Sequence, residues 1–234
     1  MARSRARTPI VLAVDVGGSH VKALTSKETE RRRFKSGPTL TAEQMVAGVL
    51  NVVDGWSWDV ASVGIPTPVR GGKVVAEPVN LGEGWVGFDY EAALGKPTKV
   101  INDATMQAVG SYEGGRMLFL GLGTGLGSTL IADGVIEPLE LGHLPFRKKT
   151  FEDYVSERGL RRSGKKKWTE AVFETVAQLT AAMEPDYVVL GGGGADALDE
   201  LPPGCRLGDN QNAFAGGFRL WDPDWLKHLG TPTA

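Results

Sequence analysis

The fold is decided by Ile10-Val11-Leu12-Ala13-Val14-Asp15-Val16-Gly17-Gly18-Ser19, an apolar run that ends in a turn of glycines with a hydroxyl residue. A second β-like run follows from Val21 to Thr25. This pattern predicts a β-hairpin. Glycine permits positive φ and lets an anion approach the backbone closely. Successive backbone N–H groups can then form a concavity for phosphate oxygens, so we expect the hairpin tip to bind phosphate.

A second stretch of the same kind lies in the other half of the chain. After Met117-Leu118-Phe119-Leu120 comes Gly121-Leu122-Gly123-Thr124-Gly125-Leu126-Gly127-Ser128, and a β-like run follows from Thr129 to Ala132. With 32 glycines in 234 residues, one such turn alone is compatible with an ordinary hairpin. Two of them, both placing glycine and hydroxyl residues at a strand end, favour two similar half-domains that clamp one phosphoryl donor between them.

Composition narrows the class of protein. Hydrophobic residues make up 41% and charged residues 23%, as in ordinary globular domains, and a net charge of −2 is no nucleic-acid or membrane signature. The single cysteine, Cys205, excludes an intramolecular disulfide and a cysteine-rich zinc cluster. The basic start is followed by an apolar run too short for a signal peptide, and no segment is long enough to span a bilayer. We expect a cytoplasmic protein that binds neither nucleic acid nor membranes.

Strands and helices alternate after each hairpin, which predicts an α/β fold. The first half shows a capping box that opens a helix at Thr41-Ala42-Glu43-Gln44, strands at Val60–Ile65 and 99–101, a loop-rich stretch over 69–88, and a helix from Asp103 to Tyr112. The second half shows a helix with an apolar stripe, Trp168, Val172, Val176, Leu179 and Met183, then a strand over 186–190, four glycines, and a last helix over 212–220. This repeat predicts domains 1–104 and 105–234, the last helix packing back on the first domain.

Two aspartates are placed for phosphoryl transfer, which needs positioned phosphates, a metal ion and a base. Asp15 stands at a strand end beside the first glycine turn, where it can hold Mg²⁺ through water or can simply cap the turn. Asp103 follows a strand in Asn102-Asp103, so it is either a helix N-cap or a general base for a substrate hydroxyl. The residues alone leave both alternatives open.

Glu140 and His143 lie three residues apart in Glu140-Leu141-Gly142-His143. This spacing lets a carboxylate and an imidazole converge on one small polar ligand, such as vicinal hydroxyls. A pair of this kind can also be plain surface polarity. One His beside one Glu, with no cysteine nearby, is a poor zinc site.

In these motifs the chain resembles the ROK sugar kinases of the actin-like ATPase superfamily, and within them the polyphosphate glucokinase branch. Six segments match in the family's order along nearly the whole chain: Asp15 to Ser19; Gly64 to Val69 with Asn80, Leu81 and Trp85; Asn102-Asp103; Leu122 to Ser128; Glu140 to His143; and Pro185 to Gly193. The resemblance implies an actin-like (ribonuclease H-like) fold, with two similar α/β half-domains around a cleft. It also implies a homodimer.

The resemblance gives each motif a role. It makes Asp103 the catalytic base that activates the primary hydroxyl of glucose, and Mg²⁺ the cofactor, with Asp15 as its ligand. The sugar would contact Pro66, Asn80, Asn102, Asp103, Glu140, His143 and Glu152. Polyphosphate or ATP would contact Asp15, Gly17, Gly18, Ser19, Lys22, Gly123, Thr124, Gly125, Gly127, Lys165, Lys167, Gly191, Gly192 and Gly193.

The chain departs from the family in two places. Many ROK kinases carry a cysteine-rich zinc segment after the histidine, where this chain has Leu144 to Thr150, so no structural zinc is expected. The segment from Gly194 to Asn212 follows the family only loosely, which makes nucleoside recognition the weakest match. Two alternatives follow: a kinase for another sugar, such as an N-acylated amino sugar, or a non-catalytic sugar sensor. A sensor of this family needs a helix-turn-helix domain, and only nine residues precede the first strand.

Two basic clusters stand out. Arg31-Arg32-Arg33 is interpreted as a solvated face. The second cluster, hereafter the basic strip, comprises Arg158, Arg161, Arg162, Lys165, Lys166 and Lys167. It either holds an extended polyanion such as polyphosphate or forms a solvated face at the start of a helix, where positive charge is unfavourable.

Overall fold

The structure is a computed structural model that describes residues 7–209 and 211–229. The chain divides into two compact units. Of the described residues, the first unit comprises 7–101 and 217–226, and the second comprises 102–209, 211–216 and 227–229. None of the described helices is long and apolar enough to cross a membrane.

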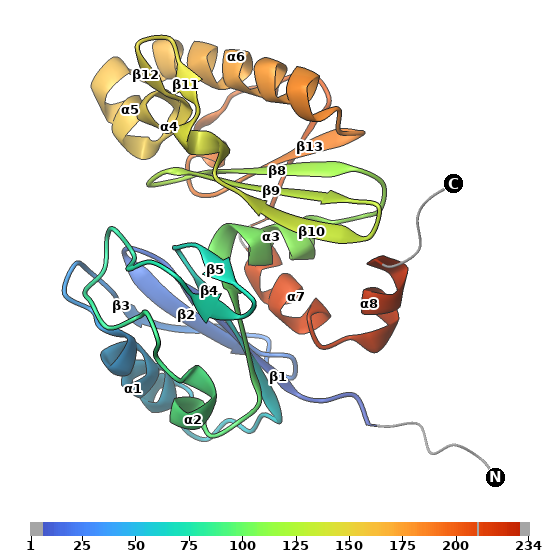
Figure 1. The fold of residues 1–234 in the computed structure, drawn as a ribbon. Helices are drawn as coiled ribbons and strands as arrows, with labels where there is room; N and C mark the ends of the chain where they lie inside the picture. Colours follow the sequence, from blue (N-terminus) through green and yellow to red (C-terminus); the bar gives the residue numbers. More distant parts are fainter. Residues whose placement is uncertain (1–6, 210, 230–234) are drawn as a thin grey trace. The chain divides into compact units, whose positions relative to one another are not determined.

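The sheet of the first unit has five strands in the order β3-β2-β1-β4-β7 (Figure 1). The strands are β1 (Val11–Val16), β2 (His20–Thr25), β3 (Arg32–Lys35), β4 (Val60–Ile65) and β7 (Thr98–Asn102). β1 pairs antiparallel with β2 and parallel with β4. β1 and β4 are buried at every position, as expected for the continuous apolar runs that predicted them. The predicted hairpin is confirmed.

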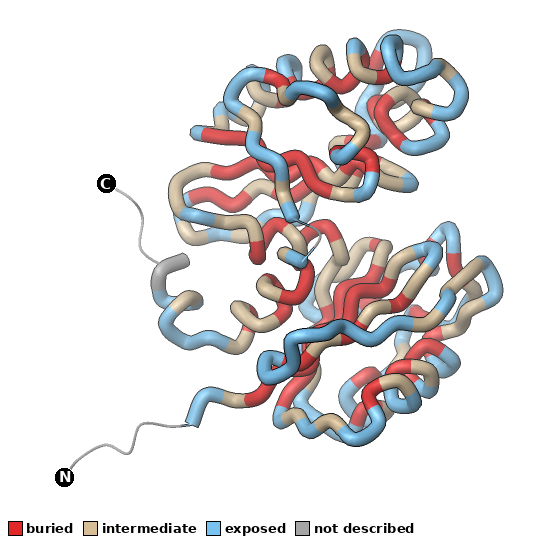
Figure 2. Tube along the Cα trace, turned by 180° about the vertical axis from the view of Figure 1, so that it is seen from behind, coloured by how far each residue is buried: buried red, intermediate tan, exposed pale blue. Residues whose placement is uncertain are grey.

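Helix α1 (Ala42–Val52) packs on this sheet to build the core of the first unit. The predicted capping box is confirmed. Thr41 Oγ1 accepts from the backbone N–H of Gln44, and Gln44 Oε1 accepts from the backbone N–H of Thr41. The loop-rich stretch contains two short strands, β5 (Val69–Arg70) and β6 (Lys73–Val74), and is followed by the short helix α2 (Tyr90–Leu94). Figure 2 shows the resulting alternation of buried strands and exposed connections.

The sheet of the second unit repeats the arrangement of the first, in the order β10-β9-β8-β13-β14. Its strands are β8 (Met117–Leu122), β9 (Leu126–Ala132), β10 (Val135–Leu139), β13 (Tyr187–Gly191) and β14 (Cys205–Leu207). β8 pairs antiparallel with β9 and parallel with β13, just as β1 pairs with β2 and β4. Helices α3 (Asp103–Ser111) and α6 (Lys165–Met183) lie on opposite faces of this sheet (Figure 1). The apolar stripe of α6 is confirmed, with Trp168 and Val172 fully buried.

The remaining elements of the second unit are short. They are η1 (Leu141–His143), β11 (Pro145–Phe146), β12 (Lys149–Thr150), α4 (Phe151–Val155), α5 (Glu157–Ser163) and η2 (Ala195–Ala197). The last two described elements are α7 (Asn212–Arg219) and α8 (Pro223–Leu229), so the predicted last helix is followed by another that the sequence did not predict. Pro223, which can begin a helix, separates the two.

One sequence interpretation needs correction, and another needs an addition. The N-cap of α3 is Asn102, whose Oδ1 accepts from the backbone N–H of Thr105 at 3.0 Å, and Asp103 is the first helical residue. Arg31-Arg32-Arg33 is exposed, as expected, but Arg32 also has a structural role. Its guanidinium donates to the carbonyls of Val52 and Asp54, both at 2.8 Å, and so caps the end of α1.

Candidate functional site

The first predicted phosphate turn, residues 17–19 and hereafter the first phosphate turn, connects β1 to β2. Asp15 lies within β1 opposite Lys22 rather than in the turn. Its buried carboxylate accepts a hydrogen bond from Lys22 Nζ at 2.9 Å. The turn itself is tied by Gly17, whose N–H donates to the His20 carbonyl at 3.0 Å and whose carbonyl accepts from Ser36 Oγ at 2.6 Å. The tip residues Gly18 and Ser19 are exposed.

One of the two reasons given for glycine in this turn is wrong: the backbone does not need a positive φ here. Neither Gly17 nor Gly18 adopts a positive φ. Instead, a Cβ on Gly17 would lie 3.1 Å from the His20 carbonyl oxygen, which is tighter than ordinary contact. The glycine at 17 therefore permits a close backbone approach within the turn, not a left-handed conformation.

The second phosphate turn, residues 123–127, closes the β8–β9 hairpin, and each of its glycines has different surroundings. None of Gly123, Gly125 and Gly127 has a positive φ. A Cβ on Gly123 would meet nothing within 4 Å, so this position leaves open space above the turn. A Cβ on Gly125 would lie 2.9 Å from Glu152 Oε2. A Cβ on Gly127 would lie 2.6 Å from Ala104 Cβ.

The contact between Gly127 and Ala104 places the start of α3 against the second phosphate turn. One residue further on, Thr105 Oγ1 and Thr129 Oγ1 share a buried hydrogen bond of 3.0 Å. Asp103, the predicted base, is partly buried at the first position of this helix, and its Oδ1 accepts from the backbone N–H of Ala104 at 2.8 Å. The helix start and the turn therefore hold the Asp103 backbone at a fixed place in the second unit.

The segment Glu140–His143 forms the 3₁₀ turn η1 and its N-cap, packed on the same hairpin. Ser128 Oγ donates to the Leu139 carbonyl at 2.8 Å and accepts from the Leu141 N–H at 3.1 Å, which fixes the turn to β9. A Cβ on Gly142 would lie 3.0 Å from the Leu126 carbonyl oxygen, so the glycine allows this close packing.

Glu140, His143 and Glu152 form a polar cluster beside this hairpin. His143 Nε2 and Glu152 Oε2 are 4.0 Å apart, and Glu152 lies in the first turn of α4. Glu140 is exposed, yet the surrounding protein raises the pKa of its carboxyl group by desolvation. The charge of His143 lowers this pKa, and the charge of Glu152 raises it further. The structure thus brings together three residues that the sequence assigned to one ligand.

The predicted sugar residues of the first unit follow β4. Pro66 comes directly after this strand, and the loop beyond it is held by Thr67 Oγ1, which donates to the Ala76 carbonyl at 2.8 Å. The exposed Asn80 lies beside the first phosphate turn, because a Cβ on Gly18 would be 3.8 Å from Asn80 Cβ.

Sequence reasoning missed Glu77 as the residue that shapes this loop. Its two carboxylate oxygens accept from the backbone N–H groups of Trp85 and Val86, at 3.0 Å and 3.2 Å. Trp85 is fully buried. An exposed glutamate in a loop carries no pattern that distinguishes it from surface polarity, so the sequence offered no signal for this role.

The glycines at 191–193 pack against the end of β8. A Cβ on Gly191 would lie 2.6 Å from the Phe119 ring, and one on Gly192 would lie 2.5 Å from the Leu122 carbonyl oxygen. Gly192 has a φ of 77°, so this position does require glycine. A Cβ on Gly193 would meet nothing within 4 Å. Two of the segments predicted to bind the donor are therefore adjacent in the second unit.

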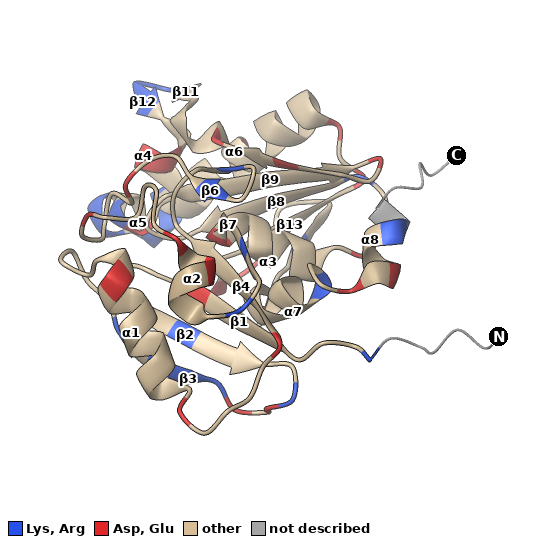
Figure 3. Ribbon diagram, turned by 60° about the horizontal axis from the view of Figure 1, so that its bottom comes forward, with Lys and Arg blue, Asp and Glu red and all other residues tan. Residues whose placement is uncertain are grey.

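The basic strip covers α5 and the first turn of α6, and Figure 3 shows basic residues gathered around α5. Four of its six members are engaged: Arg158 with Asp153 at 3.3 Å, Arg161 with Glu157 at 3.6 Å, Arg162 with the Asp153 carbonyl at 2.5 Å, and Lys165 with Asp199 at 2.6 Å. Lys166 and Lys167 are exposed on the first turn of α6, which has no acidic residue.

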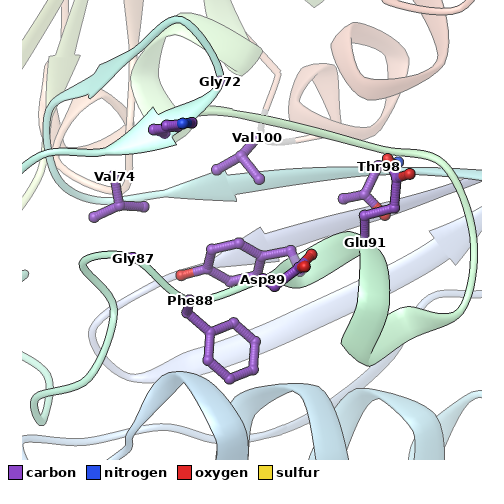
Figure 4. A pocket seen from close by; sticks show the side chains of 10 residues that line it. Gly72, Val74, Gly87, Phe88, Asp89, Glu91, Thr98 and Val100 are labelled. Atoms are coloured by element: carbon purple, nitrogen blue, oxygen red, sulfur yellow. Dashed lines mark hydrogen bonds between the residues drawn. The ribbon is translucent and has the colours of Figure 1, made fainter.

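A separate cavity of about 380 Å³ lies in the first unit, between the β5–β6 turn and the start of α2 (Figure 4). It is lined by Gly72, Lys73, Val74, Gly87, Phe88, Asp89, Tyr90, Glu91, Thr98 and Val100. None of the predicted site residues lines it. Its two acidic side chains are already used, since Asp89 caps α2 and Glu91 accepts from the Thr98 N–H at 3.3 Å.

No family model matches the chain. Among characterised proteins, it is similar to polyphosphate glucokinase from Mycobacterium tuberculosis, with 26% identity over 212 residues that cover 81% of this chain and 80% of the relative. Among solved structures, it is similar to the inorganic polyphosphate/ATP-glucomannokinase from Arthrobacter sp. strain KM, with 25% identity, a TM-score of 0.78, and coverage of 92% of this chain and 98% of the other.

A third similarity concerns the fold. The ROK family glucokinase from Streptomyces griseus, solved with glucose and AMPPNP, has 19% identity and a TM-score of 0.71 over 90% of this chain and 98% of its own. These similarities and the two matching five-stranded sheets show the actin-like ATPase fold that the motifs implied.

Proposed function

We propose that this chain is a ROK sugar kinase that transfers a phosphoryl group from polyphosphate or ATP to the 6-hydroxyl of glucose. The similar proteins carry the names polyphosphate glucokinase and polyphosphate/ATP-glucomannokinase. The observation that carries the proposal is the packing of Ala104 on Gly127. It holds a carboxylate, Asp103, at the edge of the turn that we expect to bind phosphate.

Asp103 acts as the general base in this proposal. Phosphoryl transfer depends mainly on positioning and on stabilisation of charge, and the carboxylate accepts the proton of the attacking hydroxyl. Glu140, His143 and Glu152 would bind ring hydroxyls. A site built from such groups discriminates strongly against analogues lacking a hydroxyl, because the unpaired polar groups are costly.

Each glycine turn would bind donor phosphates through backbone N–H groups, and Mg²⁺ would neutralise the charge that develops on them. The described residues hold no group of three His, Cys, Asp or Glu side chains that could cage a metal. Magnesium is commonly held by one or two carboxylates together with substrate phosphates, so the buried Asp15 suits it. Lys22, which contacts Asp15, would hold that carboxylate in place.

An assay of the purified protein tests the proposal. Glucose, mannose and N-acetylglucosamine are each offered with ATP and with polyphosphate, in Mg²⁺ and in EDTA, and the phosphorylated carbon is identified by NMR. We expect glucose 6-phosphate and complete dependence on Mg²⁺, with a reaction lacking the protein as the background. Preference for the amino sugar would favour the alternative ROK kinase, and hexose binding without turnover would favour a sensor.

The family also suggests a cytoplasmic homodimer. Light scattering of the purified chain measures the assembly directly, and a mass of about twice the 25.0 kDa of one chain is expected.

A further inference from the structure

Gly125 lies in the second phosphate turn, and the structure gives a particular reason for the missing side chain. Its φ is not positive, so the backbone there does not require glycine. A Cβ would lie 2.9 Å from Glu152 Oε2 and 3.9 Å from Glu152 Cδ, and no other atom would come within 4 Å. The space beside Gly125 is therefore taken by one carboxylate, which comes from a different element.

That carboxylate also faces the proposed sugar site. Glu152 Oε2 is 4.0 Å from His143 Nε2, and Glu152 Cβ would be 3.4 Å from a Cβ on Gly142. Glu152 thus lies between the phosphate turn and the η1 turn. Its helix is held independently on both sides: a capping box of Thr150 and Asp153 fixes the start of α4, and the N–H of Glu157 donates to the Gly123 carbonyl at 2.8 Å.

We propose that Gly125 is a positioning residue for the sugar: by lacking a side chain, it lets the Glu152 carboxylate lie against the phosphate turn and within reach of His143. The inference rests on the proposed function, because it takes Glu152 as a ligand of the acceptor. By this inference, a turn that would bind the donor phosphates also contributes to the affinity for glucose.

The geometry separates this effect from an effect on folding. The group next to Gly125 is the free end of a flexible side chain, which can swing aside at little cost. The group next to Gly127 is Ala104 at the start of α3, which cannot. A Gly125→Ala protein is therefore expected to fold, with the Glu152 carboxylate displaced from its place beside His143.

The experiment compares Gly125→Ala with Gly123→Ala, a change of the same size in the same turn whose Cβ would meet no protein atom within 4 Å. Both substitutions lie in the turn that would bind the donor, so the readout is the affinity for glucose. We expect Gly125→Ala to raise KM for glucose about tenfold or more relative to Gly123→Ala, because a hydrogen bond to a charged group is lost. Gly123→Ala should leave KM for glucose unchanged. Titration with glucose in the absence of donor should show the same loss of affinity for Gly125→Ala alone.

A rescue identifies Glu152 as the intermediary. Glu152→Asp shortens the side chain by one methylene and makes room for the new Cβ. The double variant Gly125→Ala with Glu152→Asp should therefore bind glucose more tightly than the two single losses predict. Additive losses, an unchanged glucose KM in Gly125→Ala, or failure of that variant to fold by circular dichroism would each overturn the inference. A wild-type protein that phosphorylates and binds no hexose would instead overturn the proposed function, and the inference with it.

Discussion

Two aspartates that look alike in the sequence are held in different ways. Asp15 is buried within a strand and paired with Lys22. Asp103 is partly buried at a helix start, and the capping role that could have explained it belongs to Asn102. Because the neighbouring asparagine supplies the N-cap, capping does not explain the carboxylate at position 103. This strengthens the interpretation of Asp103 as a base.

Asp103→Asn tests that interpretation. The amide is nearly isosteric and can still accept from the Ala104 N–H, so the fold and the affinity for glucose should persist. The variant cannot accept a proton, and kcat should fall on the order of 10²–10⁴-fold. Steady-state kinetics and a glucose titration measure the two effects; turnover close to that of the wild type would contradict the assignment.

Glu140 gives the site an expected pH dependence. Its pKa lies above the usual 4.5, chiefly through desolvation, so it takes up a proton at a higher pH than an ordinary glutamate as the solution is acidified. The protonated acid is a poorer acceptor for a sugar hydroxyl. As the pH is lowered, KM for glucose should therefore begin to rise while the pH is still above 4.5, because the pKa of Glu140 is raised. Glu140→Gln should have a raised KM at neutral pH that no longer changes in this range, whereas the exposed Glu137→Gln should behave as wild type.

At the scale of elements, α3 is held by contacts near both of its ends. Its first turn packs on the phosphate hairpin through Ala104. Further along, a Cβ on Gly110 would collide with the Asn212 carbonyl, and one on Gly216 would collide with the Met106 carbonyl. The backbones of α3 and α7 thus touch through two glycines. Asn212 Nδ2 adds a hydrogen bond of 2.9 Å to Ser111 Oγ.

Gly110→Ala or Gly216→Ala should destabilise the protein strongly. The methyl group meets backbone rather than a side chain that can turn away, so the helices must separate, and we expect a loss of about 3 kcal/mol or more. Gly48→Ala in α1 is the matched control: its Cβ would lie 2.6 Å from the Phe34 ring, which can move. Alanine also gains about 1 kcal/mol of helix propensity there. Denaturant melts of the three variants measure the difference, and equal losses would contradict this packing argument.

The basic strip is an element-scale feature as well, because its free charge sits on one turn of α6. Neutralising Lys165, Lys166 and Lys167 together should raise KM for polyphosphate about tenfold or more at low salt, at roughly 1 kcal/mol for each charge pair in water. The effect should shrink at moderate salt, and ATP should depend on the strip less. Neutralising Lys27, Arg31 and Arg33, exposed residues of the first unit, removes the same charge as a control. An equal response of both donors would make the strip a solvated face.

At the scale of the whole molecule, the sequence predicted the repeat but not all of its parts. The strand Val60–Ile65 and the stripe of α6 were found because burial constrains many residues at once, as a continuous apolar run in the strand and as a helical period in α6. The exposed edge strand β3 and the short helices α2, α4 and α5 were missed because few of their residues are buried. The roles of Gly125 and Glu77 depend on contacts between segments distant in sequence, which no local pattern records.

Each unit has a core of its own, and the tryptophans divide between them. Of the six in the chain, only Trp168 lies in the second unit, where it is fully buried and its Nε1 donates to the Val155 carbonyl at 2.8 Å. The difference in fluorescence between the wild type and Trp168→Phe therefore reports the unfolding of the second unit. The fluorescence of the Trp168→Phe variant reports the unfolding of the first unit.

Glucose should stabilise the folded second unit and so shift the unfolding transition that Trp168 reports to higher denaturant concentration. Asp103, Glu140, His143 and Glu152 all belong to the second unit, so a sugar bound by them opposes its unfolding. At a glucose concentration one hundred times Kd, the expected gain is about 2.7 kcal/mol, which denaturant titration resolves. Glucose should have no such effect on a variant with Glu140→Gln and His143→Ala. A shift confined to the other five tryptophans would place the sugar's ligands in the first unit and contradict a sugar site built on these four residues.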